Sequence, residues 1–178
     1  MSLSHAVLTS LLEKPSSGYD LARRFDKSIG YFWHATHQQI YRELARMEAA
    51  GWVASITAPD AGNTRKRSYR VLPAGRDELG RWALEPSAPM DLRDEVTVRL
   101  RADAALGPLG LESELLRRIT QHQDKLQTYR NIEARDFPAG KPLGRNARIQ
   151  HMILKKGMLF EQGSIDWTQE MLTVLAQA

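Results

Sequence analysis

The chain has 178 residues, of which 42% are hydrophobic and 26% charged, as expected for a globular protein with one domain or two small ones. Because it contains no cysteine, disulfide frameworks, thiolate metal sites and cysteine nucleophiles are excluded, and a reducing compartment, the cytoplasm, is expected. The net charge of +4 allows a polyanionic partner without requiring one.

Two amphipathic helices are predicted before residue 30. Apolar residues at helical spacing place the first at 3–13, and Pro15 stops it because proline cannot continue the hydrogen-bond ladder. The second helix, at 18–29, follows Ser17, whose hydroxyl can cap it together with Asp20.

A third helix is predicted in the stretch HATHQQIYRELARMEAAGW. Thr36 and Gln39 form a capping-box pair at its start, and Gly51 suits a left-handed C-cap at its end. The apolar stripe that predicts its buried face consists of Ile40, Leu44 and Met47.

The exposed face of this third helix carries types of polar residue that solubility alone does not require. Lysine and glutamate would suffice for solubility, whereas this helix begins with glutamine, tyrosine and arginine. Glutamine can read adenine, arginine can read guanine or hold a phosphate, and a tyrosine hydroxyl can hold a phosphate. The predicted DNA-reading residues are Gln38, Gln39, Tyr41 and Arg42.

The residue pattern then becomes that of a β-hairpin. Residues 52–58 and 67–72 are strand-like, and residues 59–64 between them are rich in turn formers. A fourth helix is predicted at 74–85. The basic tip of the hairpin is expected to hold the DNA backbone through Asn63, Thr64, Arg65, Lys66 and Arg67.

Three helices followed by a hairpin is the order of a winged helix-turn-helix domain, which we assign to residues 1–85. Residues 86–91 are expected to be a linker, because they are rich in proline and small residues. Residues 92–178 are helical in pattern throughout, with breaks at 107–110 and 137–144. The predicted fold class is therefore mainly α, with a winged helix-turn-helix domain followed by an all-helical dimerisation domain.

A long helix predicted at 111–135 carries an apolar seam with alternating steps of four and three residues. This spacing favours lengthwise packing on another helix, either of a second subunit or of the same chain folded into a helical hairpin. We expect a homodimer, because two long helices make a poor closed core. The residues expected to mediate dimerisation are Leu115, Ile119, Leu126 and Tyr129.

Motifs for chemistry are absent from the sequence. There is no glycine-rich nucleotide-binding motif, no G-x-S-x-G and no H-E-x-x-H, and the five histidines form no recognisable ligand set. No catalytic residue, metal site or cofactor is therefore expected. A membrane partner is not expected either, because no run of about 18 apolar residues occurs.

The stretches LLEKPSSGYDLARRF, YFWHATHQQIYRELARMEAAGWV and RKRSYRVLPAGRDEL resemble the successive motifs of the PadR-like family of transcriptional regulators. Pro73 stands where that family usually has threonine, so the start of the fourth helix is expected to differ. The second half resembles the family's helical dimerisation domain more loosely. The resemblance implies a homodimeric, ligand-responsive repressor that binds double-stranded operator DNA and has no catalytic activity.

The resemblance also implies a small aromatic effector, because members of the family respond to phenolic acids, drugs or similar molecules. The side chains expected to line an effector pocket near the junction of the two domains are Trp33, Trp82, Phe160 and Trp167. The alternative is that these side chains belong to ordinary cores.

A second function is compatible with the predicted fold. Winged helices also serve as protein–protein interaction modules, in which case the hairpin charges would only provide solubility. A protein-binding face is expected to be richer in exposed apolar residues than the face of the third helix is.

Overall fold

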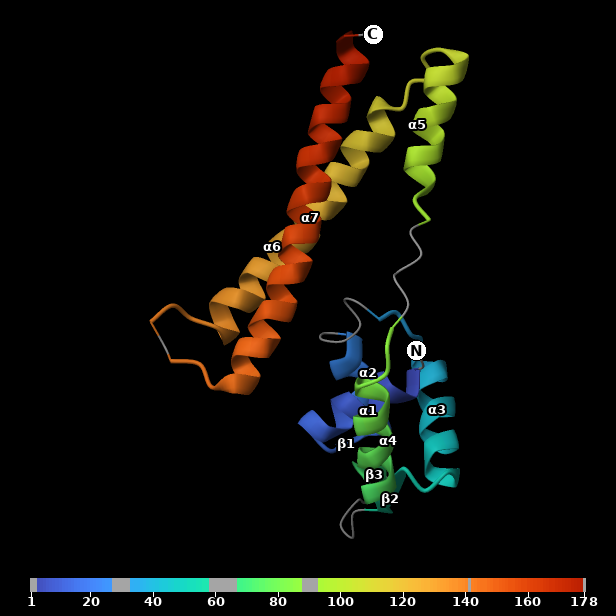
Figure 1. The fold of residues 1–178 in the computed structure, drawn as a ribbon, viewed down its shortest axis with the longest axis vertical. Coiled ribbons are helices and arrows are strands. Elements are labelled where there is room, and N and C mark those ends of the chain that lie inside the picture. Colours follow the sequence, from blue (N-terminus) through green and yellow to red (C-terminus); the bar gives the residue numbers. More distant parts are fainter. Residues whose placement is uncertain (1–2, 27–32, 58–66, 88–92, 141, 178) are drawn as a thin grey trace. The chain divides into compact units, whose positions relative to one another are not determined.

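The computed structural model describes residues 3–26, 33–57, 67–87, 93–140 and 142–177. The chain forms two compact units, Met1–Met90 and Asp91–Ala178. Figure 1 shows the mixed helices and strands of the first unit and the long helices of the second. The predicted fold class, mainly α with an N-terminal winged helix followed by long helices, is confirmed.

The first unit has the element order of a winged helix. Its elements are α1 (Leu3–Glu13), β1 (Ser16–Ser17), α2 (Gly18–Asp26), α3 (His37–Ala49), β2 (Val53–Thr57), β3 (Arg67–Val71) and α4 (Pro73–Ala83). The three strands form one antiparallel sheet in the order β1-β3-β2. The hairpin of β2 and β3 was predicted, whereas β1 falls in a stretch that the sequence indicated only as a break.

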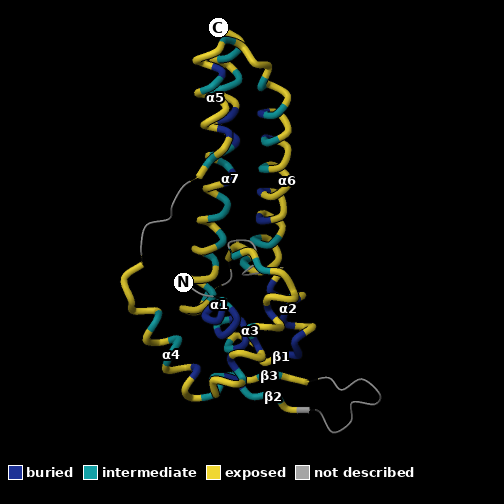
Figure 2. Tube along the Cα trace, turned by 90° about the vertical axis from the view of Figure 1, so that its right-hand side faces the viewer, coloured by how far each residue is buried: buried dark blue, intermediate teal, exposed yellow. Residues whose placement is uncertain are grey.

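Helices α1, α2 and α3 enclose the core of this unit. The predicted stripe of Ile40, Leu44 and Met47 is completely buried, and Leu21 and Phe25 of α2 are buried with it. Figure 2 shows buried residues along the inner sides of these helices. The buried stripe fixes the rotation of α3 about its axis, and its polar front therefore faces outward.

The ends of α3 follow the sequence prediction. Thr36 Oγ1 accepts a hydrogen bond from Gln39 N at 3.2 Å, and Gln39 Oε1 accepts one from Thr36 N at 2.8 Å. Gly51 has a φ of 72°, the left-handed conformation that ends many helices. Pro73 occupies the first turn of α4, and Leu72 in front of it provides no side-chain cap.

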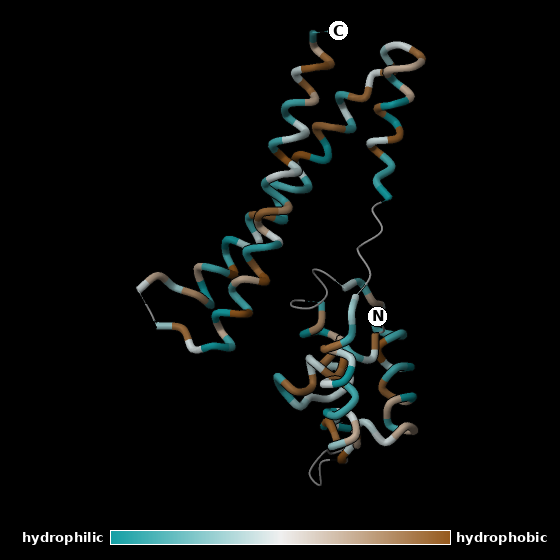
Figure 3. The backbone as a smooth tube through the Cα atoms, viewed as in Figure 1, coloured by the Kyte–Doolittle hydropathy of each residue, from teal (hydrophilic) through white to brown (hydrophobic). Residues whose placement is uncertain are grey.

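The second unit is a long helical hairpin with a third, shorter helix. Its elements are α5 (Glu95–Leu106), α6 (Glu112–Asp136) and α7 (Arg145–Gln177). Hydrophobic segments recur along the length of both α6 and α7 (Figure 3). Helix α7 continues through Gly157, where a Cβ atom would lie 3.0 Å from Cε2 of Tyr129. The glycine thus makes room for an aromatic ring of α6.

The seam on α6 faces α7 of the same chain. Ile119 and Leu126 form a buried cluster with Ile165 of α7, and the other two seam residues, Leu115 and Tyr129, are also buried. The four side chains are at most 8% exposed in the single chain. Ile119 and Leu126 therefore lie on the inner face of an intramolecular hairpin with α7, and all four seam residues are buried within the single chain.

A buried carboxylate crosses the hairpin next to this seam. Glu161 of α7 is 1% exposed and lies 2.5 Å from His122 Nδ1 and 3.0 Å from Lys125 Nζ, both on α6. Because a buried charge is costly without partners, these contacts favour this pairing of the two helices over a shifted one. Nothing in the local sequence distinguishes Glu161 from an exposed glutamate.

Candidate nucleic-acid interface

Helix α3 presents an exposed polar face at its N-terminal end. Gln38 and Arg42 are exposed opposite the fully buried stripe, and Tyr41, which is 45% exposed, flanks them. Arg42 forms no ion pair within the described residues. The amide and the guanidinium thus keep their hydrogen-bonding groups available for a ligand, and these are the side chains that recognise adenine and guanine.

Gln39 differs from its neighbours, although the sequence assigned it to the same face. Its Oε1 accepts the hydrogen bond from Thr36 N in the capping box. A bidentate contact to adenine needs both the oxygen and the nitrogen of the amide. Gln38 and Gln39 are both exposed, and the hydrogen bond gives Gln39 a structural role at the start of α3.

Tyr41 connects α3 to the first turn of α2. A Cβ atom on Gly18 would lie 2.5 Å from Cε1 of Tyr41, so a larger residue at this position would displace the ring. Ser17, immediately before, pairs with Ser68 of β3 in the sheet. The start of α2, the exposed face of α3 and the wing strand β3 consequently adjoin one another.

The wing is described only in part. Arg67, the first residue of β3, is exposed, and Asn63, Thr64, Arg65 and Lys66 lie outside the described residues. The hydrogen bonds that Glu48 of α3 accepts from Ser55 of β2 are the main cause that lowers the pKa of Glu48, and the charge of Arg67 lowers it further.

The four aromatic residues predicted for an effector pocket lie in different surroundings. Trp33 packs partly against the core of the first unit, and the ring of Trp82 is stacked on His5 at 4.4 Å. Phe160 and Trp167, seven residues apart on α7, are 60% and 40% exposed. Trp33 and Trp82 thus have partners within the first unit, and the ring of Phe160 makes an edge-to-face contact with His122 of α6 at 6.3 Å. Phe160 and Trp167 nevertheless remain accessible to solvent.

Histidines and acidic residues do not form a metal site in the part of the chain that the structure describes. His37, at the start of α3, lies 2.8 Å from Asp26 at the end of α2, which links the two helices of the motif. Within the same described residues, no helix combines the length and hydropathy needed to cross a bilayer.

Comparison with known proteins identifies the family of this chain. Residues 7–81 match the model of the transcriptional regulator PadR-like family, and residues 92–176 match the model named virulence activator alpha C-term. A probable transcriptional regulator of Mycobacterium tuberculosis, Rv1176c, is 40% identical over 99% of both chains. The chain belongs to the PadR-like family of transcriptional regulators.

Solved structures of two bacterial regulators have the same fold. The virulence activator AphA of Vibrio cholerae has a TM-score of 0.81 and 32% identity, covering 99% of this chain and 100% of its own. PadR of Bacillus subtilis, solved in complex with operator DNA, has a TM-score of 0.85 and 22% identity, covering 97% of each chain.

These matches confirm the family that the sequence motifs indicated. The PadR-like family, to which this chain belongs, is a family of transcriptional regulators and not of enzymes.

Proposed function

We propose that this chain is a sequence-specific regulator whose helix α3 reads base edges in the major groove. The observation that carries the proposal is the exposed front of α3, where Gln38 and Arg42 lie opposite a completely buried stripe and exposed Tyr41 flanks them. In helix-turn-helix proteins the N-terminal residues of the second helix enter the groove, and these three residues occupy the first turns of α3.

The wing is proposed to hold the DNA backbone beside α3. Exposed Arg67 at the base of β3 supports this role, because β3 adjoins the start of α2 and through it the face of α3. The sequence neighbours Asn63, Thr64, Arg65 and Lys66 are included for their charge and hydrogen-bonding groups. Contacts of this kind fix position and affinity without reading sequence.

A homodimer is proposed on the evidence of the second unit. Since the predicted seam is buried inside the hairpin, a second copy would cover other apolar side chains, which are exposed in the single chain. Contiguous exposed apolar surface marks interaction sites. The large exposed residues of α7 are Ile149, Met152, Ile153, Leu159, Phe160, Trp167 and Val174.

Repression and release by a small aromatic effector are proposed from the relatives. PadR of Bacillus subtilis is named a negative transcriptional regulator, and it has also been solved in complex with p-coumaric acid. We extend both properties to this chain, which would act in the cytoplasm. An effector that releases DNA must bind one conformation of the protein better than the other.

Selection of bound fragments from the source genome tests the proposed function. Purified protein is incubated with sheared genomic DNA, and the retained fragments are sequenced. We expect a small set of intergenic fragments that share a pseudo-palindromic motif. Uniform retention of the genome, or no retention, would contradict a sequence-specific regulator.

The effector is tested on a recovered fragment. Phenolic acids and planar drugs are titrated while tryptophan emission and DNA affinity are followed together, with Trp33, Trp82 and Trp167 among the four tryptophans as reporters. We expect one compound to change emission and weaken DNA binding with the same midpoint. A panel that leaves DNA affinity unchanged would contradict the ligand response.

A further inference from the structure

Helix α2, the first helix of the helix-turn-helix, exposes a tyrosine and an arginine on one side. The other side of α2 enters the core through Leu21 and Phe25, which are completely buried. Tyr19 is 56% exposed, although an aromatic ring of this size usually finds a core or a partner. Arg23 is exposed one turn further along the same helix.

The two side chains form a cation–π pair. The guanidinium carbon of Arg23 lies 5.6 Å from the centre of the Tyr19 ring, the distance of a cation–π contact. A guanidinium held over a ring has fewer conformations to lose when it binds an anion. Tyr19 thus provides a platform for the charge of Arg23.

Three other arginines of this unit are held by the chain itself. Arg46 and Arg81 form ion pairs with glutamates on their own helices, and Arg24 donates hydrogen bonds to two backbone carbonyls near the end of α1. Arg23 forms no ion pair within the described residues. Its positive charge is therefore available to an anionic ligand.

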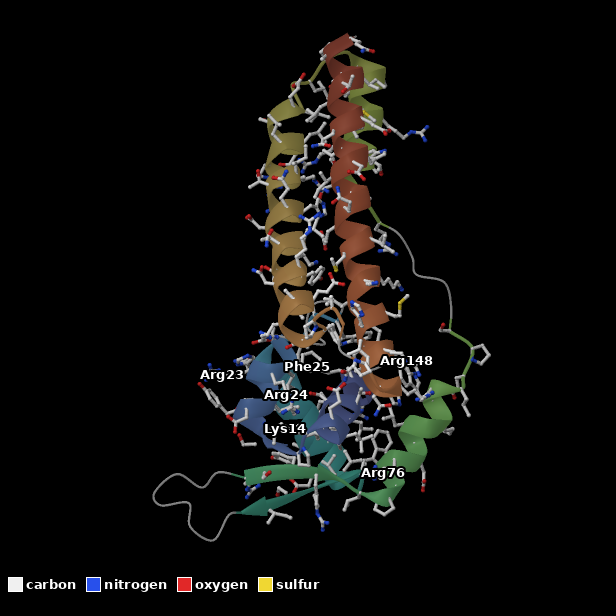
Figure 4. The ribbon with its side chains drawn as sticks, turned by 90° about the vertical axis from the view of Figure 1, so that its left-hand side faces the viewer. Lys14, Arg23, Arg24, Phe25, Arg76 and Arg148 are labelled. Carbon is white, nitrogen blue, oxygen red and sulfur yellow. The ribbon has the colours of Figure 1, made fainter. Side chains whose placement is uncertain are left out.

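The location of the pair indicates which anion it meets. Gly18, next to Tyr19, contacts the ring of Tyr41 on α3, and Ser17 pairs with Ser68 of the wing strand β3. The pair thus lies at the edge of the proposed DNA-binding surface. In a helix-turn-helix the first helix crosses the DNA backbone while the second enters the groove. Figure 4 shows Arg23 and Arg76 on opposite sides of this unit.

We propose that Arg23 binds a backbone phosphate next to the groove read by α3, and that Tyr19 is the positioning residue that holds its guanidinium. The inference rests on the proposed function, since it adds a contact to the same DNA complex. Phosphate contacts carry no sequence information, so Arg23 contributes affinity and register while α3 provides the preference.

The test compares Arg23→Ala with Arg76→Ala, which removes the same charge from an exposed position of α4 on the opposite side of the unit. Affinity is measured over a range of salt concentrations for a duplex recovered by genomic selection and for one of unrelated sequence. Arg23→Ala is expected to make the log–log salt slope shallower by about 0.9 for both duplexes, a loss of about eightfold at ~0.1 M salt. Arg76→Ala is expected to leave the slope unchanged.

Three further variants separate the ring from the charge. Tyr19→Phe keeps the ring and is expected to keep the full DNA affinity of the wild type. Tyr19→Ala is expected to lower DNA affinity, by less than Arg23→Ala does. Arg23→Lys keeps the charge and is expected to restore most of the salt slope. Thermal unfolding of each variant is expected to match the wild type, because both side chains are exposed.

Three outcomes would overturn the inference. The first is an unchanged salt slope in Arg23→Ala while the wild type still binds DNA. The second is a loss of DNA affinity in Arg76→Ala equal to that in Arg23→Ala. The third is a loss of DNA affinity in Tyr19→Phe as large as that in Tyr19→Ala. Failure of the proposed function looks different, because in that case the wild-type protein itself shows no preference between the two duplexes.

Discussion

Two glycines of α4 show how the effect of the same substitution on stability depends on the atoms around it. A Cβ atom on Gly75 would lie 2.3 Å from the backbone oxygen of Trp52, whereas a Cβ atom on Gly80 would meet nothing within 4 Å. Gly75→Ala is expected to destabilise the protein by about 1–3 kcal/mol, because a backbone atom must move. Gly80→Ala is expected to stabilise it by about 0.5–1 kcal/mol, because alanine is the better helix former.

Urea unfolding of the two variants beside the wild type gives the comparison directly. Gly80→Ala is the control for helix propensity, because it is the same substitution on the same helix without a close contact. Equal shifts in the two midpoints would contradict the close packing of α4 on the chain around Trp52.

Adjacent glutamines on α3 are expected to behave differently when replaced by alanine. Gln38→Ala should relax base preference in the selected DNA motif, at about 1–3 kcal/mol for a lost bidentate contact, and Arg42→Ala should do the same. Gln39→Ala should instead lower stability by about 0.3–1.5 kcal/mol, because its Oε1 caps the helix.

Repeated selection with each variant, together with thermal unfolding, separates the two effects. Weaker binding to all sequences in Gln38→Ala, with the preference intact, would assign that residue to the DNA backbone. A lost preference in Gln39→Ala with unchanged stability would contradict the structural role of its side chain.

Among the elements, α4 is attached to α1 by a polar cluster. Glu78 of α4 lies 2.7 Å from Arg81 and 3.1 Å from Nε2 of His5 on α1. The hydrogen bonds from Arg81, with a further contribution from His5, lower the pKa of Glu78 to about 2. The ionised form of Glu78 is therefore the form that holds α4 against α1.

This cluster predicts a loss of stability in acid. Between the ordinary glutamate pKa near ~4.3 and about 2, the unfolded chain binds a proton at Glu78 that the folded chain does not, so stability falls as pH falls through this window. Glu78→Gln should be less stable than the wild type at pH 7, and the difference should shrink toward pH ~2. A difference independent of pH would contradict the role of the ionised carboxylate.

Elements with local signals were predictable from the sequence. The capping box of Thr36 and Gln39, the C-cap at Gly51 and the proline at the start of α4 need only neighbouring residues, and each is confirmed. Strand β1 was missed because its two residues become a strand only by pairing with β3, which begins 50 residues further along the chain. No local pattern contains that information.

The candidate site was predictable to a similar extent. The buried stripe of α3 fixes which residues face outward, so the sequence correctly placed Gln38, Tyr41 and Arg42 on the exposed side. It could not distinguish Arg23 from Arg46, because the pairing of an exposed arginine with a glutamate depends on side-chain geometry.

For the whole molecule, the central expectation is self-association through the second unit. Sedimentation equilibrium at micromolar concentration should give twice the chain mass of 20.2 kDa. Glutamate is introduced singly at Met152, Leu159 and Phe160, which are exposed on α7, and at least one variant should dissociate. Leu84→Glu, at an 89% exposed position of the first unit, is the control and should remain dimeric.

A wild-type protein that sediments at the mass of one chain would contradict the dimer. If Leu84→Glu dissociates while all three α7 variants remain dimeric, the interface lies in the first unit instead.

Hydroxyl-radical footprinting of the wild-type protein on a fragment recovered from the genome tests the account most directly. A two-fold dimer that presents two copies of α3 should protect two symmetric half-sites whose centres are about 34 Å apart along the DNA, or a multiple of that distance. Methylation interference should mark base edges in the major groove within each half-site. A single asymmetric footprint, or protection confined to the backbone with no preferred sequence, would contradict the account.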